Sequence, residues 1–442
     1  MTKKTPLQTA LEQGLADDAN LFESLNELGQ YRIESIPDAE ALVDALEIYI
    51  ERPIEPPGVF TAFHQLVSLF QSVSTVSVFQ YLVRRGIPPL IRAYDQRLPF
   101  AEEQQNELLF AVKIFACYGL EEGLDRLVQA AYHPVLREGY LWSVIFEQLG
   151  DQDPLLPDLV DRMSDPLPDG FACVAFLDWV NRLVREDVIE QHPFDSHEGV
   201  QKLRHWLRSS KKDDFSFAHS SAASLPFISE PHREQLLALA MDHPDPKVQM
   251  EAAWASARLG SEAGLKFLVR LTLDRSFSTT ACAYLEELNR DDLIPDEANE
   301  ANFRAMADMC DWLAHPQEFG RAPDEIEQYD TREIFWPPTN DVRQLWLFKY
   351  RYVAEEPGEM DDCGLGFFGG TTFSLFDETY PDMPPEDAYA LHCCWELEMN
   401  EDIRAPEVRS VEAGKAILEA GARGEYATAD DDDEEDDFDE DF

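Results

Sequence analysis

The stretch HPDPKVQMEAAWASARLGSEAGLKFLVRL, residues 243–271, decides the fold. Asp245 and Pro246 stand at its start, and an acidic N-cap followed by proline at the first helical position favours the beginning of a helix. Gly260 then breaks the chain before a second apolar run. Between these signals the apolar side chains recur on one helical stripe, at Val248, Ala252, Ala255 and Leu259. The stretch therefore predicts two helices joined by a tight turn, with alanines that permit close packing.

Part of this pattern occurs twice in the chain. GLEEGLDRLV at residues 119–128 matches GSEAGLKFLV at residues 260–269. In both, a glycine ends one helix, and an acidic residue lies in the first turn of the next, where the helix dipole favours it. A weaker echo with a period of 32 links two further pairs of positions: Leu236 with Leu268, and Asp242 with Asp274. Helix pairs that repeat every 30 to 45 residues, roughly, are typical of α-solenoids.

Residues 243–271 resemble the HEAT repeat, in particular its short phycobilisome-lyase-like type. Residues 111–132 resemble it in part, and the remainder of the first 315 residues only as pairs of helices. Gln249 departs from the family pattern, which usually has arginine there. The resemblance implies a HEAT-like α-solenoid over residues 1–315 with an extended concave binding surface, and it implies almost nothing about activity.

The pattern changes after residue 315. Residues 344–353, QLWLFKYRYV, alternate between two faces, which predicts a β-strand, and the aromatic run GFFGGTTFSLF at residues 366–376 predicts another. Helices are expected over residues 383–399 and 406–421, each with proline near its start. We therefore predict a mainly α protein, in which a small α+β domain over residues 320–425 follows the solenoid and a disordered acidic tail, residues 428–442, follows that domain.

The charge of the chain restricts its partners. Its 87 acidic residues outnumber 36 basic ones, which gives a formal charge of -51, and eleven of the acids lie in residues 430–442. Nucleic-acid binding relies on Lys and Arg at phosphates, and anionic membranes attract the same residues, so neither is expected as a partner. A basic protein partner fits better.

The cysteines indicate a reducing compartment. All seven are scattered along the chain with no Cys-x-x-Cys pair. The N-terminal residues lack the apolar run of a signal peptide, and no stretch has the length of apolar sequence that a membrane span needs. We expect a cytoplasmic protein.

The glycines of residues 364–370 spell Gly-x-Gly-x-x-Gly. A dinucleotide-binding loop with this spacing follows a strand and opens a helix. Here a polar segment precedes the motif and a strand-like segment follows it, and Asp361 and Asp362 repel phosphate. We therefore expect a tight turn with close backbone packing and no bound nucleotide or other cofactor.

Two further stretches contain residue types that support catalysis or bind metals. His392, Cys393 and Cys394 are adjacent, but neighbouring side chains on a helix point about 100° apart and do not converge on one atom. HPFDSHEG at residues 192–199 has one His-Glu pair, too few for the two-iron site of deoxyhypusine hydroxylase, a HEAT-repeat enzyme. We predict no metal site.

Two functions follow from these observations. The leading hypothesis is a non-enzymatic interaction or scaffold protein that binds a basic protein on the concave face of the solenoid. The alternative is an enzyme or small-ligand-binding protein with a site where the C-terminal domain meets the solenoid. Four residues would be tested first for catalysis: Cys363, His392, Asp361 and Asp362.

Overall fold

The computed structural model describes most of the chain, and its contacts divide the chain into two compact units, residues 1–260 and 261–442. The division lies earlier than the boundary near residue 315 that the sequence suggested. The acidic tail, residues 428–442, lies outside the described residues. These are residues 4–16, 28, 31–53, 61–150, 154–315, 318–354, 360–370, 374–376 and 383–425.

The described part of the first unit is helical. Its earlier helices are α1 (Pro6–Ala16), α3 (Ile36–Ile50), α4 (Ala62–Ser68), α5 (Val76–Arg85), α6 (Ile87–Arg97), α7 (Gln105–Tyr118) and α8 (Glu121–Tyr132). Its later helices are α9 (Trp142–Glu147), α10 (Leu156–Ser164), α11 (Gly170–Arg185), α12 (His197–Arg208), α13 (Phe215–Ser224), α14 (His232–Met241) and α15 (Pro246–Arg258).

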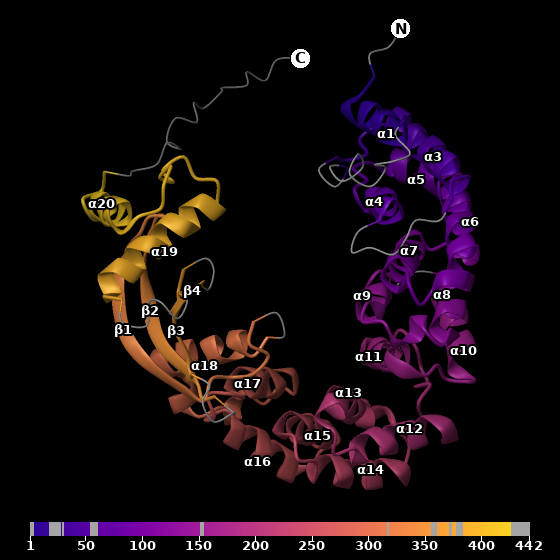
Figure 1. Ribbon diagram of the computed structural model, residues 1–442. Helices are drawn as coiled ribbons and strands as arrows, with labels where there is room; N and C mark the ends of the chain where they lie inside the picture. The colour runs from indigo at the N-terminus through magenta and orange to yellow at the C-terminus, as the bar shows by residue number, and fades with distance from the viewer. Residues whose placement is uncertain are drawn as a thin grey trace, which may run out of the picture. The chain divides into compact units, whose positions relative to one another are not determined.

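These helices pack in two layers (Figure 1). In the first layer α4, α7, α9, α11, α13 and α15 each pack on the next. In the second layer α6 packs on α8, α8 on α10, and α12 on α14. No helix of the described residues is long and apolar enough to cross a membrane.

A repeated His-Pro turn follows three of these helices. In each turn the Nδ1 atom of the histidine accepts a hydrogen bond from the backbone N–H two residues later. These N–H groups lie outside the helices and have no intrahelical acceptor, so the imidazole ring supplies one. The pairs are His133 with Val135 at 3.3 Å, His192 with Phe194 at 3.2 Å and His243 with Asp245 at 3.1 Å.

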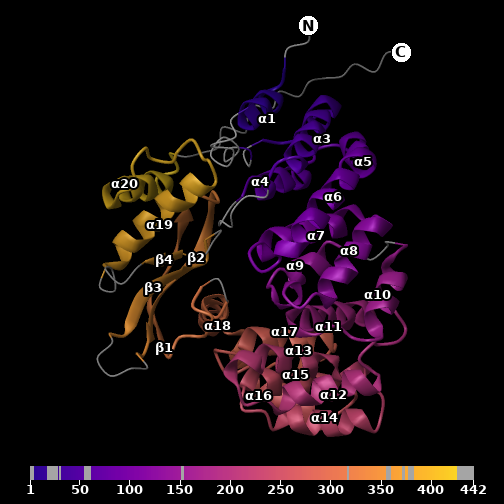
Figure 2. The same ribbon diagram turned by 45° about the vertical axis from the view of Figure 1, so that its right-hand side comes forward.

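The second unit contains helices and one antiparallel sheet with strand order β1-β2-β3-β4. Figure 2 shows the strands side by side and α19 packed against them. The elements are α16 (Glu262–Leu271), α17 (Ser278–Glu287), α18 (Ala301–Leu313), β1 (Glu325–Trp336), β2 (Asp341–Tyr352), β3 (Asp362–Phe368), β4 (Ser374–Phe376), α19 (Pro385–Met399) and α20 (Val411–Ala422).

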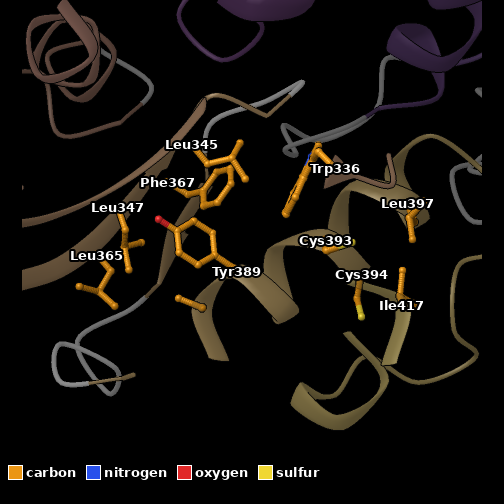
Figure 3. Close-up of a cluster of buried hydrophobic side chains, with 11 residues drawn as sticks. Trp336, Leu345, Leu347, Leu365, Phe367, Tyr389, Cys393, Cys394, Leu397 and Ile417 are labelled. Carbon is orange, nitrogen blue, oxygen red and sulfur yellow. The ribbon is translucent and has the colours of Figure 1, made fainter. Parts of the chain in front are cut away.

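Strand β2 contributes to two hydrophobic cores. Leu345 and Leu347 join the core beneath α19 and α20, where Figure 3 shows them with Phe367 and Tyr389. The intervening side chains join a second core with α18: Trp346, Phe348, Tyr350 and Tyr352. The alternation predicted for residues 344–353 is thus confirmed.

The glycines of residues 364–370 allow close contacts around β3. The single strand expected over residues 366–376 is wrong, because β3 ends at Phe368 and β4 begins at Ser374. A Cβ atom on Gly366 would lie 2.7 Å from the Sδ atom of Met309 in α18. Gly369 has a φ of 103°, and a Cβ there would lie 2.5 Å from the carbonyl oxygen of Gln344. The motif therefore lies in an antiparallel strand and the turn after it, and close packing accounts for two of its glycines.

We predict that Gly369→Ala lowers the free energy of unfolding of the second unit by about 1–3 kcal/mol, because alanine is strained at a positive φ and meets the backbone of β2. Gly366→Ala is the matched variant, and it should cost less because the flexible Met309 side chain can move. Hydrogen exchange of the β2 and β3 amides measures both effects. If both variants lower the free energy of unfolding equally, the positive φ of Gly369 and its contact with the β2 backbone are not what makes alanine costly there.

Candidate functional site

Three titratable side chains form a row across successive first-layer helices. Asp178 belongs to α11, His219 to α13 and Glu251 to α15. The Nε2 atom of His219 lies 3.2 Å from Oε1 of Glu251. Asp178 lies close enough to His219 and to Ser220, the next residue of α13, for both to influence its pKa. The contact of α13 with α11 on one side and α15 on the other therefore connects the three groups.

The row is open to water on one side and crowded on the others. The Glu251 side chain is only 5% exposed, whereas that of His219 is 41% exposed. Asp178 is also exposed to solvent. Its hydration is incomplete, and this desolvation raises the pKa of Asp178 to about 6. The nearby Ser220 side chain and the charge of His219 act in the opposite direction.

Charge from both neighbours acts on the imidazole of His219. Desolvation lowers its pKa, but the hydrogen bond and the charge of Glu251, with Asp178 and Asp245 adding to them, outweigh that effect. The pKa of His219 is therefore raised above its ordinary value of 6.5. An imidazole between two carboxylates can hold a proton near neutral pH, and the carboxylates can accept a cationic group.

Arg185, Arg258 and Trp254 lie further along α11 and α15, and Phe227 lies in the turn that follows α13. The guanidinium carbon of Arg185 lies 5.3 Å from the ring centre of Trp254, and that of Arg258 lies 5.6 Å from the same ring. Arg258 also lies 5.7 Å from the ring centre of Phe227. On α11 and on α15, the arginine follows the acidic residue of the row by two helical turns. Cation–π contacts of this kind hold each guanidinium over the face of an aromatic ring.

Of the candidates named from sequence, Cys363 and Asp361 lie near a pocket in the second unit. The pocket has a volume of about 560 Å³, and Cys363 lines it together with Arg275, Glu327 and Lys349. Burial, followed by the charge of Asp361, raises the pKa of the Cys363 thiol, which opposes formation of a reactive thiolate.

The aspartates beside this pocket have structural partners. Asp361 accepts a hydrogen bond from the Arg351 guanidinium at 3.0 Å and one from the Ala354 N–H at 3.0 Å. Asp362 begins β3 and pairs with Tyr352 of β2. The Asp361 carboxylate and the backbone of Asp362 therefore hold the end of the β2–β3 pair.

His392 lies in the α19 core and does not line this pocket. Its Nε2 atom lies 3.2 Å from Oε1 of Glu396, and both side chains are fully buried. The ring packs on Phe367 with centroids 3.7 Å apart, and burial lowers the pKa of His392. The Trp336 indole N–H donates to Oε2 of Glu396 at 2.5 Å. His392 and Glu396 thus form a buried polar pair, and the structure does not bring His392 together with Cys363.

The residues of the stretch 192–199 also have separate partners. The Nε2 atom of buried His192 lies 2.9 Å from Oδ1 of Asn181. Asp195 accepts a hydrogen bond from the Ser229 N–H at 2.9 Å. Glu198 lies in the first turn of α12, 3.8 Å from the Lys202 ammonium. Across the residues that the structure describes, no group of three or more His, Cys, Asp or Glu side chains could hold a metal ion.

None of the three members of the row was predicted from the sequence, although the sequence contains a signal for two of them. His219 and Glu251 are 32 residues apart, the same period that links Leu236 with Leu268. Polar residues one repeat apart occupy equivalent places on neighbouring helices, where they can meet. Asp178 belongs to a helix that is apolar on most faces, and its neighbours along the chain do not mark it.

We predict that Glu251→Gln lowers the pKa of His219, since it removes the carboxylate that stabilises the imidazolium. Because the pKa of His219 is raised on folding, its pairing adds stability below about pH 6.5 that is lost as the pH rises through the folded pKa. NMR titration of the His219 Cε1–Hε1 signal measures the shift, with Glu186→Gln, at the residue that follows α11, as the control. An unchanged titration curve in Glu251→Gln would argue against the row.

We also predict that His192 makes the fold sensitive to acid. Burial lowers the pKa of His192 to about 3 from 6.5, so between these values the unfolded chain binds a proton that the folded chain does not. The free energy of unfolding should therefore fall as the pH falls from 6.5 towards 3. His192→Gln should be less stable at neutral pH and show a shallower slope, measured by urea unfolding at several pH values. A slope as steep as that of the wild type would refute the assignment.

Comparison with models of known protein families and with curated proteins finds no match to this chain.

Proposed function

We propose that this chain is a non-enzymatic protein-binding scaffold whose first-layer helices bind a basic segment of a protein partner. The observation that carries the proposal is the row of Asp178, His219 and Glu251, which crosses three successive helices and is open to solvent at Asp178 and His219. A site made by three helices of one layer suits an extended partner better than a small molecule.

A basic partner follows from the electrostatics of the row. Asp178 is an incompletely hydrated carboxylate whose pKa is raised to about 6. A lysine or arginine placed beside it would stabilise the charged form of the carboxylate and offset its desolvation. The formal charge of -51 attracts such a partner from a distance and speeds its association.

The arrangement of the first unit supports a HEAT-like α-solenoid. Its first-layer helices pack in chain order, and the three His-Pro turns repeat one local geometry along the unit. Each helix pair then contacts mainly its neighbours, which is the organisation that gives repeat proteins their extended binding surfaces. The seven free cysteines support a cytoplasmic setting.

A second candidate function is the binding of a small ligand in the second unit. The pocket of about 560 Å³ beside Cys363 favours it, since its lining combines Arg275 and Lys349 with Glu327. The raised pKa of Cys363 and the burial of His392 favour binding over thiol chemistry at this place.

We predict that Asp178→Asn combined with Glu251→Gln weakens partner binding about tenfold, which corresponds to roughly 1.4 kcal/mol. The two amides keep the shape of the side chains and remove both charges. Quantitative affinity capture at low salt identifies the proteins that the wild type enriches and the variant does not, and titration with the purified partner then gives the ratio of Kd values.

Glu186→Gln is the control, because it removes an exposed acid that directly follows α11 and lies outside the row. Equal enrichment by the wild type and the double variant would contradict the proposed surface. Enrichment of no protein by the wild type at low salt would contradict the scaffold function itself.

A further inference from the structure

An aromatic pocket lies where α12 meets α13 in the first unit. Trp206 from the last turn of α12 and Phe217 from the first turn of α13 line it, and its volume is about 370 Å³. The two ring planes stand at 67° to each other, with centroids 5.9 Å apart. Both side chains are half-buried, so the rings form two apolar walls that a ligand can reach. Aromatic rings that remain accessible in a pocket are typical of binding sites.

The charged residues that line the pocket are two carboxylates and one ammonium: Asp169, Glu198 and Lys202. The ammonium lies 2.6 Å from Asp169 and 3.8 Å from Glu198. Asp169 also lies 3.5 Å from Arg137, but that guanidinium is shared with Glu138 at 3.0 Å. The Asp169 and Glu198 side chains remain 60% and 45% exposed, so the lining has an excess of negative charge that a ligand can contact.

A cation suits the aromatic walls and the carboxylates together. The carboxylates attract it, and the face of an aromatic ring, above all that of Trp, attracts it through the ring quadrupole. Among the cationic side chains, the guanidinium is planar, stacks on rings and donates several hydrogen bonds to carboxylates at the same time. The first unit already contains this contact, because Arg185 and Arg258 each lie over the ring of Trp254.

The aromatic wall continues beyond the pocket. The ring centre of Phe217 lies 6.4 Å from that of Phe171, the second residue of α11, and Phe171 lies 5.4 Å from Tyr140. Tyr140 is 83% exposed. A peptide can therefore place apolar residues over these two rings while one of its side chains occupies the pocket, and a small guanidinium compound cannot.

We propose that this pocket binds an arginine side chain of a protein partner, with the guanidinium against Trp206 and the carboxylates of Asp169 and Glu198. The neighbouring residues of the partner lie over Phe171 and Tyr140. No lining residue of the pocket belongs to the row on α11, α13 and α15, so the proposal does not rest on the function assigned to that row.

Titration of the full chain with short peptides tests the proposal, and the NMR signal of the Trp206 indole N–H reports binding at the pocket. The probe is a capped tripeptide with arginine between two leucines. Matched peptides carry lysine or citrulline in place of the arginine, and citrulline keeps its shape without the charge. We expect the Kd of the lysine peptide to be about threefold higher, and that of the citrulline peptide about tenfold higher, than that of the arginine peptide.

Four results would overturn the proposal or part of it. A Trp206 signal that does not move with the arginine peptide would refute the site. Equal Kd values for the arginine and citrulline peptides would show that charge plays no part, and equal values for arginine and lysine would refute the choice of arginine. Methylguanidinium that binds as tightly as the arginine peptide would assign the pocket to a small guanidinium compound and contradict the protein partner.

Two variants with opposite expected effects test the charge of the pocket. Glu198→Gln should raise the Kd of the arginine peptide about threefold, because the amide keeps the shape and removes one negative charge. Lys202→Gln should lower the Kd about twofold, because it removes the ammonium that competes for both carboxylates. Glu190→Gln, an exposed acid beyond the opposite end of α11, is the control and should leave the Kd unchanged. Weaker binding in Lys202→Gln would indicate an anionic ligand and overturn the proposal.

Discussion

The close approach of α11, α13 and α15 depends on the small side chains of α13. Ala218, Ser221 and Ala222 are fully buried. Larger residues there would separate the helices on either side. The Asn181 amide of α11 can therefore donate to the backbone oxygen of Ser220 at 3.2 Å. The same proximity brings Glu251 to His219, so the row of charged groups is a consequence of packing beneath it.

The two helices over residues 243–271 could be predicted because their signals are local. Asp245 accepts a hydrogen bond from the Lys247 N–H at 2.9 Å, and α15 begins at Pro246, as the sequence indicated. Strand β1 was missed for an equally local reason. The register shifts between Gln328 and Asp330, and this bulge breaks the alternation by which a strand is recognised. The alternation of β2 is unbroken, and that strand was predicted correctly.

The polar sites were harder to predict because their members come from different elements. Glu396 follows His392 by one helical turn, so the spacing alone could have paired them. Nothing in the sequence showed that Trp336 would donate to the same carboxylate or that burial would isolate the pair from Cys363. The row on α11, α13 and α15 required the register between helices, which the weak repeat of 32 residues only suggests.

Strand β2 contributes alternate side chains to two hydrophobic cores, one on each face of the sheet. Leu347 packs towards α19 while Phe348, the next residue, packs towards α18. A change in the twist or position of this strand must displace side chains on both faces at once. The two cores of the second unit therefore cannot vary independently: a substitution accepted beneath α19 must also suit the packing of α18, although the two helices lie on opposite faces of the sheet.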